Sequence, residues 1–219
     1  MTRRVGQVGR LRRVRERARR LLVSDDLLTV NDYLQLTDED DCYELLDGVL
    51  VERTMAAMYP HEQLAVWMIT VLRLYADFKQ LGVVLGSRTA VQITEFRSRL
   101  PDALFVRRDR AHIITDPIIV GAPDWVFEIR SKANYPADWH SLEVDYRSIG
   151  VGELWLVDPQ AGIVRVVRRA ETGYIAFEQS DGRLASTAIP DFWVETPWLF
   201  FGGERPSTHE MLQRLGVAW

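Results

Sequence analysis

The stretch Pro123-Asp-Trp-Val-Phe-Glu128-Ile-Arg130-Ser131 decides the fold, because it is typical of a buried β-strand that contains a glutamate. Alternate residues of a strand share a face, so the even-numbered residues from Asp124 to Arg130 lie on one face. Trp125, Phe127 and Ile129 lie on the other. A carboxylate inside so apolar a run is costly unless something pairs with it. We therefore favour a functional role for Glu128 over a structural ion pair with Arg130 or Arg88.

A second Pro-Asp begins another apolar strand, Pro101-Asp102-Ala-Leu-Phe-Val. If the two strands are neighbours, Asp102 and Glu128 converge on one spot and form a hard-oxygen site suited to Mg²⁺ or Mn²⁺. Phosphodiester hydrolysis needs an activated water molecule and neutralisation of the developing negative charge, and a divalent ion held by carboxylates can supply both. The alternative is that Asp102 and Asp124 simply occupy corners that favour Pro-Asp. We prefer this structural interpretation for Asp124 alone.

The composition is that of a globular protein, with 219 residues, 47% hydrophobic and 26% charged, which fits one domain with a full core. A single cysteine, Cys42, excludes a disulfide framework and a thiolate zinc site, and we expect a cytoplasmic location. No apolar run approaches the roughly 20 residues that span a bilayer.

The net charge of −4 hides an asymmetry, because residues 1–20 contain nine arginines and one glutamate. This segment is therefore +8 and the remainder −12. A basic arm on an acidic body either binds nucleic acid or is a solvated tail, and we favour the tail. We expect residues 1–24 to form a basic N-terminal extension with a loose helix from Leu11 to Leu22, followed by one domain over 25–205 and a tail over 206–219.

Hydrophobic periodicity predicts a long helix over 60–79 and a second helix over 137–149. Thr29 and Asp32 fit a capping box for a short helix over 29–36, and Asp47-Gly48 fits a hairpin turn. The expected strands are 83–93, 102–108, 125–130, 153–158, 163–169, 173–179 and short edge strands within 184–201. The order predicts an α/β or α+β fold with a central mixed sheet flanked by helices.

Four further residues are candidates for the site. Arg130 shares a strand face with Glu128 and can stabilise charge, although arginine cannot act as a base. His61, at the start of the long helix, is either a local cap or surface residue, or a substrate-phosphate contact or proton carrier. Glu44 is either a solvent-exposed residue or a further acid of the site, and the sequence favours neither. Arg88 is a candidate for substrate binding or for pairing with Glu128.

Several motifs, in order from about residue 27 to 201, resemble the Uma2 family of putative restriction endonucleases, within the PD-(D/E)XK nuclease superfamily. They are Tyr43-Glu-Leu-Leu-Asp-Gly48, Pro60-His61, Arg99-Leu-Pro-Asp102, Pro123 to Ser131, Tyr146 to Val151 and Leu154-Trp-Leu-Val-Asp158-Pro159.

This resemblance implies a restriction-endonuclease-like core, DNA as the substrate, and Mg²⁺ or Mn²⁺ held by Asp102 and Glu128, with Glu44 as a third acid. Many relatives place a lysine four residues before the tyrosine that matches Tyr146, and here that position is Leu142. Either Arg130 substitutes for this lysine or catalysis has decayed.

Three interpretations follow. The first is a metal-dependent endonuclease acting on DNA, for which a homodimer is plausible because duplex DNA is two-fold symmetric. The second is a catalytically decayed DNA-binding or interaction module of the same fold. The third is a structural or partner-binding domain with no nucleic-acid role, suggested by the acidic body and the aromatic residues between Phe192 and Phe201.

Overall fold

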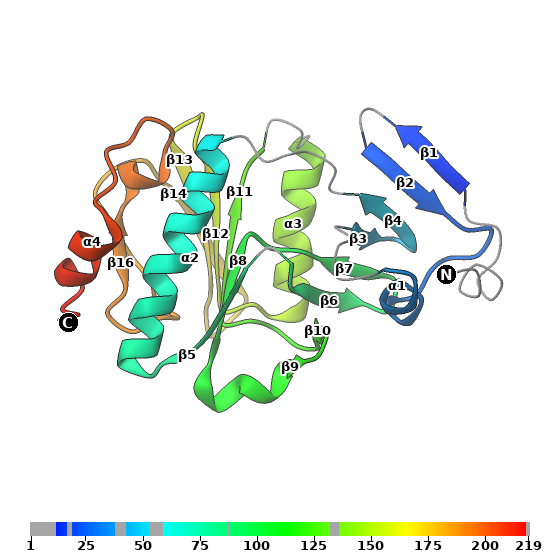
Figure 1. Cartoon of the computed structure of the whole chain (residues 1–219), viewed down its shortest axis with the longest axis horizontal. Coiled ribbons are helices and arrows are strands. Elements are labelled where there is room, and N and C mark those ends of the chain that lie inside the picture. Colours follow the sequence, from blue (N-terminus) through cyan, green and yellow to red (C-terminus); the bar gives the residue numbers. More distant parts are fainter. Residues whose placement is uncertain are drawn as a thin grey trace. The chain divides into compact units, whose positions relative to one another are not determined.

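The computed structural model describes residues 12–16, 19–37, 43–52, 59–86, 88–131 and 136–217, and within 12–21 and 136–138 only the backbone. The chain divides into two units (Figure 1). Unit one comprises Met1–Ala56, Arg88–Leu100 and Ile114–Gly121, and unit two comprises Ala57–Ser87, Pro101–Ile113 and Ala122–Trp219. Among the described helices, none is both long enough and apolar enough to cross a membrane.

Unit two is built on a six-stranded mixed sheet in the order β14-β13-β12-β11-β8-β5. Its strands are β5 (Gly82–Gly86), β8 (Ala103–Arg107), β11 (Trp125–Ile129), β12 (Glu153–Asp158), β13 (Ile163–Arg169) and β14 (Tyr174–Gln179). Only β11 and β12 run parallel, and α3 (Pro136–Ile149) connects them along the chain; the other neighbours are antiparallel. The predicted central mixed sheet with flanking helices is therefore confirmed.

Helices cover both faces of this sheet. The long helix α2 (Tyr59–Lys79) shares the larger hydrophobic core with Trp125, Phe127 and Ile129, which lie on one face of β11. The other face meets α3, because the Tyr146 hydroxyl reaches Glu128. β11 is buried along its whole length, as its near-continuous apolar sequence predicts for a central strand.

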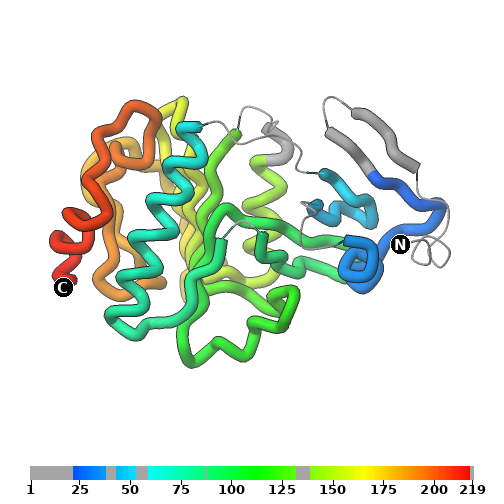
Figure 2. Tube along the Cα trace, in the orientation of Figure 1, coloured from blue at the N-terminus to red at the C-terminus, as the bar shows by residue number. Residues whose placement is uncertain are grey.

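In unit two, η1 (Arg108–Ile113) follows β8, and the C-terminal part contains the two-stranded sheet of β15 (Arg183–Ala185) and β16 (Trp193–Glu195), η2 (Thr196–Leu199) and α4 (Thr208–Arg214). Figure 2 shows the red C-terminal segment beside α2, and the indole of Trp67 donates to the Pro206 carbonyl at 3.0 Å. Residues 206–219 were expected to form a tail, yet Met211 and Leu212 are buried in the larger core. The predicted domain boundaries remain predictions.

Unit one contains an eight-stranded sheet in the order β1-β2-β4-β3-β7-β6-β10-β9. Its strands are β1 (Arg12–Glu16), β2 (Arg19–Val23), β3 (Tyr43–Leu46), β4 (Val49–Glu52), β6 (Ala90–Thr94), β7 (Arg97–Arg99), β9 (Ile114–Thr115) and β10 (Ile118–Ile119). Residues 83–93, expected as one strand, therefore divide between β5 of unit two and β6 of unit one. A separate core surrounds Leu28, Leu45 and Leu50.

The capping box and the hairpin turn that the sequence predicts in unit one are both confirmed. Thr29 caps α1 (Val30–Leu36), and Asp32 completes the capping box. Asp47 and Gly48 join β3 to β4 with φ angles of 51° and 75°, as a tight hairpin turn with two left-handed residues requires.

The helix expected from Leu11 to Leu22 is wrong, because the described residues there form β1 and β2. Leu21 and Leu22 pair with Val51 and Leu50 of β4. Arginine favours helices only by a few tenths of a kcal/mol, and this long-range pairing overrides the preference.

Candidate active site

Asp102 directly precedes β8, and Glu128 lies on the neighbouring antiparallel strand β11, where Phe127 pairs with Ala103. Continuing this register by one residue sets Asp102 opposite Glu128. Directly opposite residues have Cβ atoms about 4.5–5.5 Å apart, so the structure brings these two predicted site residues together. Both are only 3% exposed.

Asp102 is fixed by the strand beside it and lies against His61. Its Oδ2 atom accepts a hydrogen bond of 2.8 Å from the backbone N–H of Ile129. The Nε2 atom of His61, in the first turn of α2, lies 3.6 Å from the same oxygen and 3.3 Å from the Ile129 carbonyl oxygen. The long helix therefore brings an imidazole to Asp102.

Glu128 is held from the opposite side by α3. The fully buried Tyr146 hydroxyl donates a 2.7 Å hydrogen bond to Oε1 of Glu128. Tyr146 belongs to one of the motifs of the sequence, but the sequence predicted no role for it at the site. The sequence places Tyr146 in the helix that follows the glutamate strand, but its contact with Glu128 depends on how that helix crosses the sheet.

Leu142 lies one helical turn before Tyr146 on α3 and is 5% exposed. Residues four apart on a helix share a face, so the position where many relatives carry a lysine holds a buried aliphatic side chain. Lys132, the lysine next along the chain from Glu128, lies outside the described residues.

The other two polar residues of the glutamate strand are engaged elsewhere in unit two. Arg130 donates to Oδ2 of Asp158 at 2.6 Å. Asp124 accepts hydrogen bonds from the Arg107 backbone at 2.8 Å and from Arg110 at 2.7 Å. These bonds join the end of β8 and η1 to the residue before β11, and they support the structural interpretation of Asp124. The charge-stabilising role of Arg130 stays a prediction.

Glu44 and Arg88 belong to unit one. Glu44, on β3, is half-buried and accepts hydrogen bonds from the Leu100 backbone at 3.3 Å and from Arg99 at 3.4 Å. Arg99 is itself 3% exposed, and sequence reasoning gave this buried cation no role although it lies within the quoted motif. Arg88 is exposed in the turn before β6, and its proposed contact with substrate stays a prediction.

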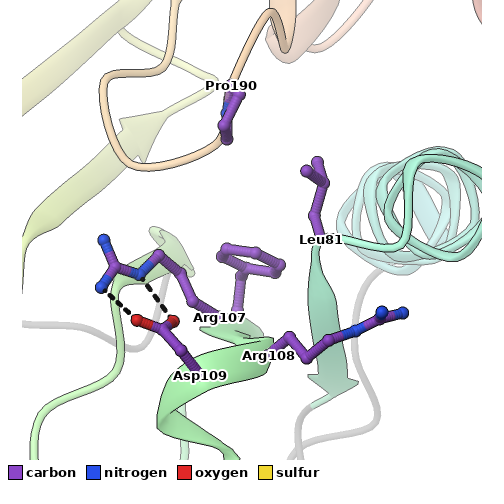
Figure 3. Close-up of a pocket in the computed structure, with 6 residues that line it drawn as sticks. Leu81, Arg107, Arg108, Asp109 and Pro190 are labelled. Carbon is purple, nitrogen blue, oxygen red and sulfur yellow. Dashed lines mark hydrogen bonds and ion pairs between the residues drawn. The ribbon is translucent and has the colours of Figure 1, made fainter.

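A separate hollow of about 340 Å³ lies at the far end of β8 (Figure 3) and is lined by Leu81, Phe105, Arg107, Arg108, Asp109 and Pro190. Arg107 forms a two-bond ion pair with Asp109, at 3.2 and 2.9 Å, beside a mostly apolar wall. Arg107 lies five positions along the chain from Asp102, a span of about 17 Å in a strand. The hollow is therefore not the place where the carboxylates converge.

Comparison with known proteins gives the same assignment as the motifs. The family model described as "Putative restriction endonuclease", Uma2, matches residues 30–197. A solved structure of a putative nuclease of the DUF820 group from Anabaena variabilis is 18% identical, with a TM-score of 0.66, covering 80% of this chain and 98% of its own. No curated protein matches the sequence. The similarity to the solved structure supports the fold, and the family model covers most of the chain. The chain therefore belongs to the Uma2 family of putative restriction endonucleases.

Proposed function

We propose that this protein is a metal-dependent endonuclease that hydrolyses phosphodiester bonds of DNA. The observation behind the proposal is the pair of buried carboxylates, Asp102 directly before β8 and Glu128 on the neighbouring β11, which the strand register, continued by one residue, sets opposite each other. Two like charges held together away from water are costly unless a proton or a cation compensates them. The family assignment supports the same reaction class.

The donor atoms fit Mg²⁺ or Mn²⁺. Both carboxylates supply hard oxygens, and Mg²⁺ in proteins commonly takes one or two carboxylates and fills its other positions with water and substrate oxygens. Among the described residues no group of three or more acidic, histidine or cysteine side chains surrounds one point. Asp102 and Glu128 would therefore hold the ion together with water and substrate oxygens. Once bound, the ion would activate water and stabilise charge on the phosphate.

The surrounding residues position this pair. The Ile129 N–H and the Tyr146 hydroxyl each hold one carboxylate oxygen in place. The 3.6 Å separation of His61 Nε2 from Asp102 Oδ2 supports a role for this imidazole in hydrogen-bonding a substrate phosphate or in carrying a proton. We assign it to substrate binding.

The test is nicking of supercoiled plasmid by the purified protein with Mg²⁺ or Mn²⁺, compared with Glu128→Gln. This change removes the charge and keeps the side-chain size and an acceptor for Tyr146. We expect the natural chain to nick the plasmid and the variant and an EDTA control to be inactive. The matched control, Glu178→Gln, alters an exposed glutamate on β14 and should leave nicking unchanged. Metal-dependent nicking at the natural rate by Glu128→Gln would overturn the assignment.

A second function, a DNA-binding module whose catalysis has decayed, is favoured by the buried Leu142. It predicts DNA binding without turnover. Leu142→Lys would then give weak metal-dependent nicking that Leu142→Met, a volume-conserving control, does not give. Robust nicking by the natural chain would eliminate this second function.

A further inference from the structure

The strand β14 lies at one edge of the six-stranded sheet of unit two, and among the described strands only β13 pairs with it (Figure 1). An edge strand presents a row of backbone N–H and C=O groups to which another strand can pair, and natural edges are commonly protected by lysine, proline or a bulge. β14 contains neither lysine nor proline, and its register with β13 is continuous. Within the part of the chain that the structure describes, this edge is therefore open to a further strand.

The hairpin between β13 and β14 determines which backbone groups point outward. The N–H of Ala170 donates to the Gly173 carbonyl at 3.0 Å, directly beyond the paired residues Arg169 and Tyr174. Hydrogen-bonded and non-hydrogen-bonded pairs alternate along an antiparallel ladder, so every second residue of β14 directs its backbone groups away from β13. These outward residues are Tyr174, Ala176 and Glu178.

The side chains along this edge are mainly apolar. Ile175 is 61% exposed. Phe177 lies two residues further along on the same face and is half-buried against the larger core. Ala176, on the opposite face, is also exposed. Covering such a strand removes apolar surface from water, which is favourable.

We propose that β14 pairs with β14 of a second copy of this chain, antiparallel and about a two-fold axis, so that two six-stranded sheets join into one. Pairing of one strand with itself is isologous and closes after two copies. All three outward residues of each copy form backbone hydrogen bonds in one register alone, which is centred on Ala176. In that register Ala176 is opposite the partner's Ala176, and Tyr174 is opposite the partner's Glu178.

The same register suits the side chains. It sets Ile175 directly opposite the partner's Phe177, and the two-fold axis repeats this apolar pair. The pair occupies a non-hydrogen-bonded position of the new ladder, where side chains approach most closely. It also keeps the two Glu178 carboxylates apart, whereas a register centred on Glu178 would oppose like charges. The strand is therefore complementary to itself, which identifies a second copy as the occupant.

The proposed interface is small. Six residues from each copy are fewer than the 20–30 residues a side of a standard stable interface, so the dimer should dissociate on dilution. The pairing does not depend on the proposed nuclease function. A dimer that does not nick DNA, or a monomer that does, would each decide one of the two proposals without affecting the other.

The experiment is analytical ultracentrifugation of the full-length chain at concentrations up to about 1 mM, the upper limit of a weak specific affinity. We expect a concentration-dependent shift from monomer to dimer and no larger species. Ala176→Pro removes an N–H that points away from β13, so it breaks the two central hydrogen bonds of the dimer and none of the β13–β14 ladder. Ile175→Lys places a charge at the edge. Each variant should raise the dissociation constant of the dimer about 10-fold or more.

The matched control is Val144→Lys, which adds the same charge at a 49% exposed valine on α3 and should leave the dimer unchanged. Thermal unfolding checks that each variant is folded, and Ile175→Lys carries the test if Ala176→Pro is not. A natural chain that stays monomeric at 1 mM would overturn the proposal, as would a dimer that both variants leave intact. Open chains longer than a dimer would also overturn it, because they would indicate pairing of β14 with the opposite edge strand, β5, of the next copy.

Discussion

Removing the carboxylate of Glu153 should destabilise unit two more than any surface substitution. Glu153 begins β12 and is fully buried. Its Oε1 accepts hydrogen bonds from Trp155 and Arg168, each at 2.9 Å. Its Oε2 accepts from the Ser186 hydroxyl at 2.6 Å and from the backbone N–H groups of Thr187 and Ala188 at 2.8 and 3.1 Å. One carboxylate thus joins the central sheet to the loop after β15.

The magnitude follows from the donors that the substitution leaves behind. Breaking a buried ion pair by removing one partner costs about 3–5 kcal/mol. Arg168 is 25% exposed at its side chain and can regain some hydration, so we expect about 3–4 kcal/mol for Glu153→Ala. Glu153→Gln is not conservative, because either orientation of the amide sets an N–H₂ group against existing donors, and we expect about 2–3 kcal/mol.

Chemical denaturation and calorimetry measure this loss. For a chain of this size, 3–4 kcal/mol lowers Tm by roughly 6–16 °C. The control is Glu178→Ala, at a 59% exposed glutamate whose nearest guanidinium is 4.0 Å away, which should change the free energy of unfolding by less than about 0.5 kcal/mol. If Glu153→Ala unfolds within about 1 kcal/mol of the natural chain, the hydrogen-bond reasoning is refuted.

Two further predictions concern the helix that faces the glutamate strand. Tyr146→Phe removes the hydrogen bond to Glu128 and should weaken metal affinity about 10-fold, as loss of an outer hydrogen-bond partner typically does; titration calorimetry with Mn²⁺ checks this, and unchanged affinity would contradict it. Hydrogen bonding to Arg165 lowers the pKa of Glu143. The contribution of the ionised Glu143 to folding stability is therefore complete above the ordinary glutamate pKa of about 4.3, and it is lost as the pH falls through the lowered pKa. Arg165→Gln should therefore flatten the acid side of the stability curve measured by urea unfolding, and an unchanged curve would exclude this linkage.

Much of the fold could be predicted because its signals are local. The long helix follows from apolar residues at helical spacing, and the Asp47-Gly48 turn and the Thr29 capping box each depend on residues a few positions apart. The basic strands could not be predicted this way. Their conformation depends on pairing of Leu21 and Leu22 with β4, about thirty residues further along the chain.

Glu128 could be predicted as a site residue because it is a glutamate within an apolar strand. Glu153 has the same sequence context, but its surroundings differ. Glu153 is surrounded by donors from residues 186–188, whereas Glu128 lies opposite a second carboxylate. The sequence indicates that each glutamate is compensated, but the compensating groups are set by contacts distant along the chain. The same limit applies to Tyr146 and to the His61–Asp102 contact.

The division of the chain has a consequence for how the protein can be taken apart. The chain passes from unit one to unit two and back twice, so unit one is assembled from the N-terminal segment and two later excursions, Arg88–Leu100 and Ile114–Gly121. No single cut releases either unit intact. A truncation that removes residues 1–56 would take β3 away from β7 and expose buried Leu100 and Ile118, which share a core with Leu28, Leu45 and Leu50. Loss of the N-terminal strands would therefore destabilise the segment that directly precedes Asp102. Neither unit can be expressed alone as one continuous piece of the chain.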